Sequence, residues 1–207
     1  MNATHEVRRL SGALGAEVRG ISLGQVRAAE AEMIQSLLMA HQVLFFPDQH
    51  VTPDQHIAFG RHFGPIAGHP HLSNLPGYPE IFDLAASRGG VADEWHSDIT
   101  FQQHPSVLAI LNMVQCPKVG GDTMWANMYA AYDGLSAPLQ ELCNGLTALH
   151  DASPHGKPEK MAIHPVVRIH PVTRRKSLFV NEHFTRRLVE LSHEESTVLL
   201  GYLTRWV

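Results

Sequence analysis

The stretch EWHSDITF, residues 94–101, lies in the strand-rich middle of the chain and decides its fold class. Its mixture of aromatic and β-branched residues predicts a strand. Successive side chains of a strand point to opposite faces, so residues two apart share a face. His96 and Asp98 are therefore expected to project from one side, while Ser97 points to the other. An imidazole nitrogen and a carboxylate oxygen on one face can reach a common point.

Further strand-like runs lie on both sides of this stretch. Each is short, rich in aliphatic or aromatic residues, and bounded by Gly, Pro or polar residues. They are two runs around Gly12 and Gly15 and the segments 43–46, 80–85, 106–114, 122–126, 166–170 and 177–181. Residues 64–79 and 151–164 are predicted to be loops, because Pro, Gly and polar residues dominate the first and polar residues the second.

Helices are predicted from apolar side chains at helical spacing and from capping residues. Thr52 with Gln55, and Ser192 with Glu195, form capping boxes. The expected helices cover 26–41, 53–63, a short segment after Asn127, 136–143 and 193–207. Short strands with a few helices predict an α+β fold, mainly β, with a β-barrel or jelly-roll core surrounded by helices.

The length and composition are those of a globular protein with one sizeable domain or at most two small ones. The chain has 207 residues, of which 44% are hydrophobic and 17% charged, and its formal net charge is −4. This mild acidity speaks against nucleic-acid binding and against a polybasic membrane surface. The N-terminus lacks the apolar stretch of a signal peptide, and no apolar run approaches the about 20 residues that span a bilayer. Cys116 and Cys143 form no CxxC pair, so a reduced, cytoplasmic setting is expected.

The chain has 15 histidines against 16 lysines and arginines together. Histidine is the commonest side-chain metal ligand, so this excess favours a metal site, although any single histidine can equally be a surface or loop residue. His96 and Asp98 could supply two corners of the two-histidine, one-carboxylate triad of non-haem iron(II) oxygenases. The pair alone is weak evidence, since a surface hydrogen-bonded pair gives the same sequence. Trp95 and Phe101 add apolar walls beside it.

Four segments carry a resemblance to a known family. They are HQVLFFPDQHVTPDQHIAFGRHFG (41–64), WHSDITF (95–101), GGDTMWANMYAAYDGLS (120–136) and HPVVRIHPVTRRKSLFVNEHFT (164–185). In order and approximate spacing they resemble the taurine dioxygenase family of iron(II)- and 2-oxoglutarate-dependent dioxygenases. The similarity runs from about residue 6 to the end of the chain.

The resemblance implies a double-stranded β-helix, a cupin-like jelly roll with flanking helices, in an enzyme that uses Fe(II) and the cosubstrate 2-oxoglutarate. It implies that His96 and Asp98 bind iron and that Thr123 binds a carboxylate of 2-oxoglutarate. It also implies that His69 contacts an anionic substrate and that Phe184 forms a wall of the substrate pocket. The alternatives are a strand residue facing solvent or neighbouring side chains for Thr123, a loop histidine without a ligand for His69, and core packing for Phe184. No acid, base or nucleophile from the protein is assigned.

Three departures from the family pattern bear on the substrate. Leu72 stands where the taurine enzymes have a tyrosine, VADE (91–94) replaces a segment that carries an asparagine, and Ala152 stands where they have a phenylalanine. These departures argue against taurine itself. The resemblance implies hydroxylation of a small anionic substrate such as a sulfonate, an alkyl sulfate or an aryloxy acid, with O2 consumed and 2-oxoglutarate converted to succinate. Family members often form dimers or tetramers, so a homo-oligomer is an open expectation.

Two parts of the family pattern have no counterpart in the 207 residues: the third iron ligand, a histidine beyond the last helix, and the arginine that anchors 2-oxoglutarate. His164, His170 and His183 match other parts of that pattern. The chain is therefore expected to be a single dioxygenase domain, residues 1–207, truncated at its C-terminus. The rival functions are a non-catalytic truncated remnant or metal-binding module and, on the His/Asp pair alone, a zinc hydrolase on a cupin-like barrel.

Overall fold

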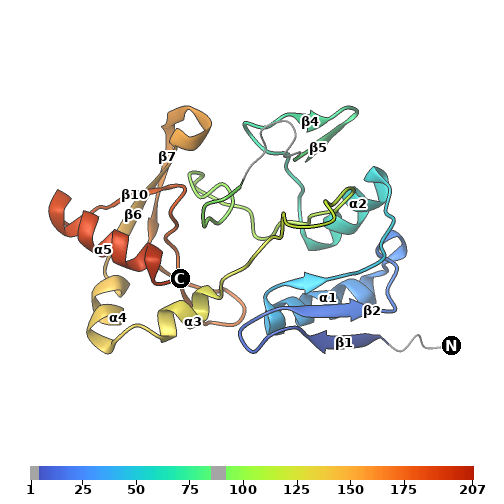
Figure 1. Cartoon of the computed structure of the whole chain (residues 1–207), viewed down its shortest axis with the longest axis horizontal. Coiled ribbons are helices and arrows are strands. Elements are labelled where there is room, and N and C mark those ends of the chain that lie inside the picture. Colours follow the sequence, from blue (N-terminus) through green and yellow to red (C-terminus); the bar gives the residue numbers. More distant parts are fainter. Residues whose placement is uncertain (1–4, 85–91) are drawn as a thin grey trace. The chain divides into compact units, whose positions relative to one another are not determined.

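The computed structural model describes residues 5–84 and 92–207 (Figure 1). The chain divides into two compact units, which are described separately. Unit 1 comprises Met1–Val91 and Ile110–Trp125, and unit 2 comprises Ala92–Ala109 and Ala126–Val207. Helices and strands are mixed in both units, so the α+β character expected from the sequence is confirmed. No helix among the described residues is long and apolar enough to cross a membrane.

Unit 1 begins with a small sheet covered by a helix. Strands β1 (Glu6–Arg9) and β2 (Ala16–Arg19) are antiparallel, and β3 (Leu44–Phe45) joins β2 in parallel. Helix α1 (Ala28–His41) carries the buried Ile34, which packs with Val18, Ile21 and Phe59. Helix α1 connects the parallel strands β2 and β3, as parallel pairs require a crossover. Its apolar side chains at helical spacing form one hydrophobic cluster with residues of the sheet and of α2, as the sequence predicts.

The rest of unit 1 is built from short elements. Helix α2 (Pro53–Gly60) starts at Thr52, whose side chain accepts a hydrogen bond from the backbone N–H of Gln55, and the predicted capping box is confirmed. Helix α2 contacts the 3₁₀ turn η1 (Leu23–Gln25), which precedes α1 in the chain. At its C-terminal end α2 continues into the 3₁₀ turn η2 (Arg61–Phe63). Strands β4 (Asn74–Leu75) and β5 (Tyr78–Phe82) form a hairpin. Of the predicted strand 80–85, Ala85 lies outside the described residues.

Unit 2 is organised around an antiparallel sheet with the order β10-β6-β7. Its strands are β6 (Thr147–Ala152), β7 (Lys157–Pro165) and β10 (Thr185–Leu188), and the 3₁₀ turn η4 (Ser153–His155) links the first two. Strands β8 (Val167–Ile169) and β9 (Lys176–Leu178) pair separately. The helices are α3 (Met128–Asp133), α4 (Ala137–Asn144) and α5 (His193–Arg205).

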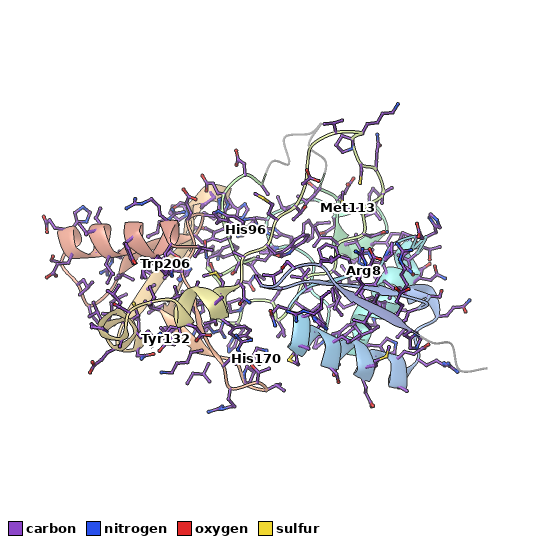
Figure 2. All side chains as sticks on the ribbon, turned by 60° about the horizontal axis from the view of Figure 1, so that its bottom comes forward. Arg8, His96, Met113, Tyr132, His170 and Trp206 are labelled. Carbon is purple, nitrogen blue, oxygen red and sulfur yellow. The ribbon has the colours of Figure 1, made fainter. Side chains whose placement is uncertain are left out.

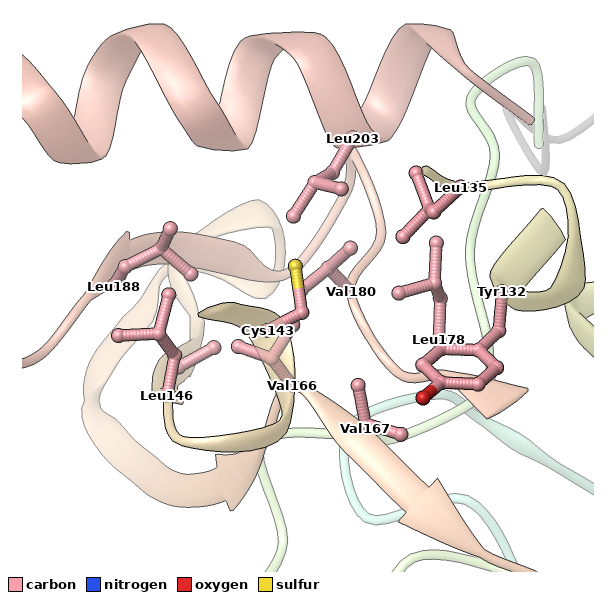
Figure 3. Packing of buried hydrophobic residues seen from close by; sticks show 11 residues of the cluster. Tyr132, Leu135, Cys143, Leu146, Val166, Val167, Leu178, Val180, Leu188 and Leu203 are labelled. Carbon is pink, nitrogen blue, oxygen red and sulfur yellow. The ribbon is translucent and has the colours of Figure 1, made fainter. Parts of the chain in front are cut away.

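The core of unit 2 lies between this sheet and its helices. Alternate residues of β6 are buried, which is the pattern of a strand with one face in a core. Leu203 of α5 meets Leu188 of β10 and Leu146 in the same cluster (Figure 3). The Trp206 indole (Figure 2) donates a hydrogen bond to the Ala131 carbonyl of α3, at 2.9 Å. The C-terminal helix is therefore fixed by both apolar and polar contacts.

Three predicted strands are wrong: the segments 94–101, 106–114 and 122–126 form no strand. Residues 98–101 make a turn instead, in which Ile99 has φ +47°. In the other two segments large apolar side chains stand in solvent, with Val107 93% and Val114 90% exposed. The strand propensity of a residue depends on how its side chain packs against a neighbouring strand. Within residues 5–84 and 92–207, no strand pairs with these segments.

The prediction of a loop over 151–164 is also wrong, because β7 and the end of β6 occupy most of it. The polar and charged residues that suggested a loop lie on the exposed positions of β7, whereas Ala162 and His164 are buried. Pairing with β6, from Thr147↔Pro165 to Asp151↔Met161, fixes the segment as a strand. Cross-strand pairing thus outweighs the local composition.

Candidate metal centre

The side chains of His96 and Asp98 converge, as expected, although the backbone between them is not a strand. The Nε2 atom of His96 lies 3.4 Å from Oδ1 of Asp98. The two side chains are 30% and 53% exposed, so both are reached by solvent. His96 lies just before the turn at 98–101, and Asp98 is the first residue of that turn. An ion could therefore approach a nitrogen and an oxygen donor at one place.

The backbone orients the ring of His96. Its Nδ1 atom lies 2.8 Å from the carbonyl oxygen of Glu94, which can only accept, so Nδ1 carries a proton. The hydrogen bond with the Asp98 carboxylate raises the pKa of His96, and burial opposes this rise. In the protonated ring Nε2–H faces Asp98; in the neutral ring Nε2 offers a lone pair. A metal ion would take the place of that proton, an arrangement typical of ligating histidines.

A second histidine ties down the chain just before His96. Nδ1 of His183 lies 2.7 Å from Oε2 of Glu94, and the His183 and His96 ring centroids are 5.6 Å apart. The backbone N–H groups of Glu182 and His183 both donate to the Trp95 carbonyl, at 3.1 and 3.4 Å. The segment that carries His96 is therefore fixed on the loop between β9 and β10. The sequence analysis gave no role to Glu94. The only sign of a role in the sequence was that its negative charge lies two residues before His96.

An apolar wall lies behind the pair. Phe184 is only 3% exposed and clusters with Phe101 and Ala152, while Ile99 packs against them. The Phe184 ring centroid is 6.4 Å from that of His96 and 5.3 Å from that of Phe101. Its burial fits the core-packing alternative, and its edge-to-face contact with His96 places it directly beside the candidate ligands.

Unit 1 holds the other two predicted site residues. Nδ1 of His69 accepts hydrogen bonds from the backbone N–H groups of His71 and Leu72, both at 3.1 Å. A neutral ring in this tautomer has its proton on Nε2, which can donate to an anion. Thr123 is exposed and lies outside any helix or strand. His69 and Thr123 belong to unit 1, whereas His96, Asp98 and Phe184 belong to unit 2.

Sequence reasoning missed a buried polar network in unit 2. His150, on β6, is fully buried, and its Nδ1 lies 2.9 Å from the hydroxyl oxygen of Thr100 and 3.2 Å from that of Thr185. Nε2 of His164, on β7, contacts the carbonyl oxygens of Thr100 and Gln102. In the sequence ALHDA (148–152), His150 shares a strand face with Ala148 and Ala152. This alternation with small residues could have indicated that His150 faces a core.

The described residues supply two donors for a metal ion. The nitrogen of His96 and the carboxylate of Asp98 suit iron(II) and other first-row divalent ions. Among the described residues, no group of three His, Cys, Asp or Glu side chains is placed to hold an ion. His164 and His170 have a ring nitrogen engaged with backbone groups, and Nδ1 of His183 faces Glu94. Among residues 5–84 and 92–207, the pair therefore offers two side-chain ligands without a third beside them.

Comparison with known proteins identifies the family. The family model "Taurine catabolism dioxygenase TauD, TfdA family" matches residues 6–207. An alpha-ketoglutarate-dependent sulfate ester dioxygenase of Pseudomonas putida is 34% identical over 97% of this chain and 75% of its own length. An alpha-ketoglutarate-dependent sulfonate dioxygenase of Saccharomyces cerevisiae is 31% identical, and the match covers 96% of this chain but only 54% of the yeast protein.

Solved structures agree with this assignment. The crystal structure of a putative alpha-ketoglutarate-dependent taurine dioxygenase from Burkholderia xenovorans superposes with a TM-score of 0.83 at 35% sequence identity. The match covers 99% of this chain and 73% of that one. The chain thus spans between about half and three quarters of the length of these relatives. On the match of the family model over residues 6–207, the chain belongs to the taurine catabolism dioxygenase family.

Proposed function

We propose that this protein is an iron(II)- and 2-oxoglutarate-dependent dioxygenase that hydroxylates a small anionic organic substrate. The observation that carries the proposal is the approach of His96 Nε2 to Asp98 Oδ1, at 3.4 Å, in a chain of this family. A nitrogen and a carboxylate oxygen held this way are two of the three protein ligands of a non-haem iron oxygenase site. The third ligand and the arginine for 2-oxoglutarate belong to neither unit as described.

In this proposal the iron and 2-oxoglutarate supply the oxidation of a C–H bond by O2, with release of succinate and carbon dioxide. The protein positions the reactants and excludes water. His96 and Asp98 hold the ion, and the Thr123 hydroxyl binds a carboxylate of 2-oxoglutarate. Nε2–H of His69 donates to the anionic end of the substrate. The hydrogen bonds that Nδ1 of His69 accepts from two backbone N–H groups support this role, because they leave the ring proton on Nε2. Phe184 limits the site on its apolar side.

The substrate class follows from the relatives and from the departures. The yeast and Pseudomonas relatives are named for sulfonates and sulfate esters, and this chain has Leu72 and Ala152 where taurine enzymes have aromatic residues. These two departures argue against taurine as the substrate. We therefore propose an alkyl or aryl sulfonate, an alkyl sulfate or an aryloxy acid as substrate, and we place taurine outside this class.

The fold and setting of the whole protein are part of the same proposal. We propose one dioxygenase domain with a cupin-like jelly-roll core, to which the β10-β6-β7 sheet contributes strands. The protein acts in the cytoplasm, as a dimer or tetramer, on a small molecule and with neither nucleic acid nor membrane as partner. Its mild acidity and its two unpaired cysteines support this setting.

Anaerobic titration with iron(II) and 2-oxoglutarate tests the proposal. The purified protein should develop the weak visible charge-transfer band of the iron chelate, and admission of O2 should bleach it with formation of succinate. A panel of alkanesulfonates, alkyl sulfates and aryloxy acids should then show which class accelerates succinate formation. Absence of the band at saturating ligand would refute the proposal and favour the non-catalytic remnant. Hydrolysis of a substrate without O2 and 2-oxoglutarate would refute it in favour of the zinc hydrolase.

A further inference from the structure

The turn that carries Asp98 has an unusual backbone. Ile99 has φ +47°, in the left-handed region, and the N–H of Gln102 donates to the Ile99 carbonyl at 3.0 Å. A β-branched residue rarely occupies this region, because its side chain collides with its own backbone. Such a conformation persists only where surrounding contacts determine it. The contacts that hold this turn therefore also determine where Asp98 points.

His164 provides one of these contacts. Its Nε2 atom lies 2.8 Å from the carbonyl oxygen of Thr100 and 3.0 Å from that of Gln102. Both carbonyls only accept, so Nε2 carries a proton and donates it to both. The ring is buried, and burial lowers the pKa of His164. His164 lies near the end of β7, the edge strand of this sheet, and its pairing with Ala148 of β6 fixes the backbone that carries the donor.

Thr100 is held at its side chain as well. Its hydroxyl oxygen lies 2.9 Å from Nδ1 of His150 and accepts from the side-chain amide of Asn181 at 3.3 Å. Thr100 and His150 are both fully buried. The ring of Phe179 packs against both histidines, with centroids 5.7 Å from His150 and 5.3 Å from His164. This packing leaves the two imidazoles little freedom to turn.

We propose that His164 is a positioning residue for the candidate metal centre. Its Nε2–H holds the carbonyls of Thr100 and Gln102, which keeps Ile99 left-handed and keeps the Asp98 carboxylate directed at His96. His164 itself is not proposed as a ligand, because its Nε2–H is engaged by the carbonyl oxygens of Thr100 and Gln102. The proposal deepens the function proposed above and rests on it for the identity of the site.

The consequence of losing this donor follows from the strain at Ile99. Without it, the buried carbonyl of Thr100 and the partly buried carbonyl of Gln102 lose their shared donor. The turn then relaxes toward a right-handed or extended Ile99, which moves Asp98 away from His96. Outer contacts of metal ligands typically contribute about 10- to 100-fold to metal affinity. We expect a loss of that size when the donor is removed, and recovery when another side chain supplies it.

Three variants separate these outcomes. His164→Phe keeps a ring among the aromatic neighbours but has no donor, whereas His164→Gln places an amide N–H near the position of Nε2. Leu203→Ala is the control, since it destabilises the core of unit 2 without touching the turn. Binding of Mn(II) to the purified protein, measured by electron paramagnetic resonance, should weaken about 10- to 100-fold in His164→Phe and stay near wild type in the other two.

A second readout does not depend on a metal. Hydrogen exchange of the Gln102 amide should accelerate at least about 10-fold in His164→Phe relative to the Val189 amide, and stay slow in His164→Gln. If His164→Phe does not fold, His164→Asn replaces it, because its shorter amide cannot reach both carbonyls. Unchanged exchange, or unchanged Mn(II) affinity in a variant with fast exchange, overturns the proposal. A wild-type protein that binds no Mn(II) refutes the proposed function, while the exchange rates still decide whether His164 holds the turn.

Discussion

His150 shows how one buried side chain links the sheet of unit 2 to the candidate metal centre. It is fully buried on β6 and contacts the hydroxyl groups of Thr100 and Thr185. Burial, with a smaller contribution from His164, lowers its pKa from 6.5 to about 3. In the folded protein the ring is therefore neutral at pH values well above this pKa of about 3.

The lowered pKa of His150 predicts how stability changes with pH. Between about pH 6.5 and pH 3 the unfolded chain binds a proton at this residue and the folded chain does not. The free energy of unfolding therefore falls as the pH drops below 6.5, by up to about 1.4 kcal/mol per pH unit from this group. Urea unfolding between about pH 7 and pH 5 should show this slope in wild type and a smaller one in His150→Phe.

An exposed histidine gives the matched control for this prediction. His193→Gln, at the start of α5, should keep the wild-type dependence on pH. An equal slope in His150→Phe and wild type would show that His150 is protonated as readily in the folded protein as in the unfolded chain.

At this scale the sequence predicted the convergence of His96 and Asp98 and missed what holds them. The two side chains do approach each other, although the strand at 94–101 from which the prediction was made is not formed. The contacts of His164 and His150 with Thr100 join residues 50 or more positions apart, and a single sequence carries no signal for such pairs. The roles of Thr123, His69 and Phe184 remain predictions.

Among the elements, α5 depends on its N-terminal cap. The Ser192 hydroxyl accepts a hydrogen bond from the Glu195 N–H, and the Glu195 carboxylate accepts one from the Ser192 N–H. The helix brings Leu203 into the core of unit 2, and its buried Ser196 accepts a hydrogen bond from the Leu188 N–H. Fraying at the cap would therefore weaken the contact with β10.

Removal of this cap should destabilise the protein measurably. Ser192→Ala is expected to lower the free energy of unfolding by about 1 kcal/mol, because it leaves helix N–H groups unsatisfied. Thr197→Ala is the control: it also loses a hydroxyl, but inside the same helix, where alanine is the better helix former. Equal stability of Ser192→Ala and wild type in urea unfolding would show that the cap contributes nothing.

The contrast between helices and strands explains which elements could be predicted. The caps at Thr52, Asn127 and Ser192 are local, and the structure confirms all three. Strands depend on a distant partner, so 106–114 was predicted where the structure has no strand, and β7 was missed where pairing with β6 creates one.

At the scale of the whole molecule, the segment 106–125 stands out because large apolar side chains in it are exposed to solvent. Apolar side chains there are exposed, among them Val107, Val114 and Val119, each at least nine-tenths. Within the described ranges, the backbone of these residues forms no helix, strand or backbone–backbone hydrogen bond. Exposed backbone with apolar side chains is a substrate for proteases that cut beside such residues.

Limited proteolysis tests this description of the segment. Thermolysin should make its first cuts between residues 106 and 120, ahead of any cut in α1 or in the β10-β6-β7 sheet, because those backbones are hydrogen-bonded and their apolar side chains partly buried. Mass spectrometry of early fragments locates the cuts. Initial cleavage inside β6 or α1, with 106–120 intact, would show that the segment is covered in solution.

The central claim is that His96 and Asp98 together hold one metal ion, and calorimetric titration with Mn(II) tests it most directly. Asp98→Ala and His96→Ala should each lower the affinity by more than the about 10- to 100-fold typical of outer contacts. Asp133→Ala, which removes an exposed carboxylate from α3, should bind as wild type does. Wild-type protein should bind one ion per chain. Unaltered affinity in both the His96 and the Asp98 variant would contradict the claim.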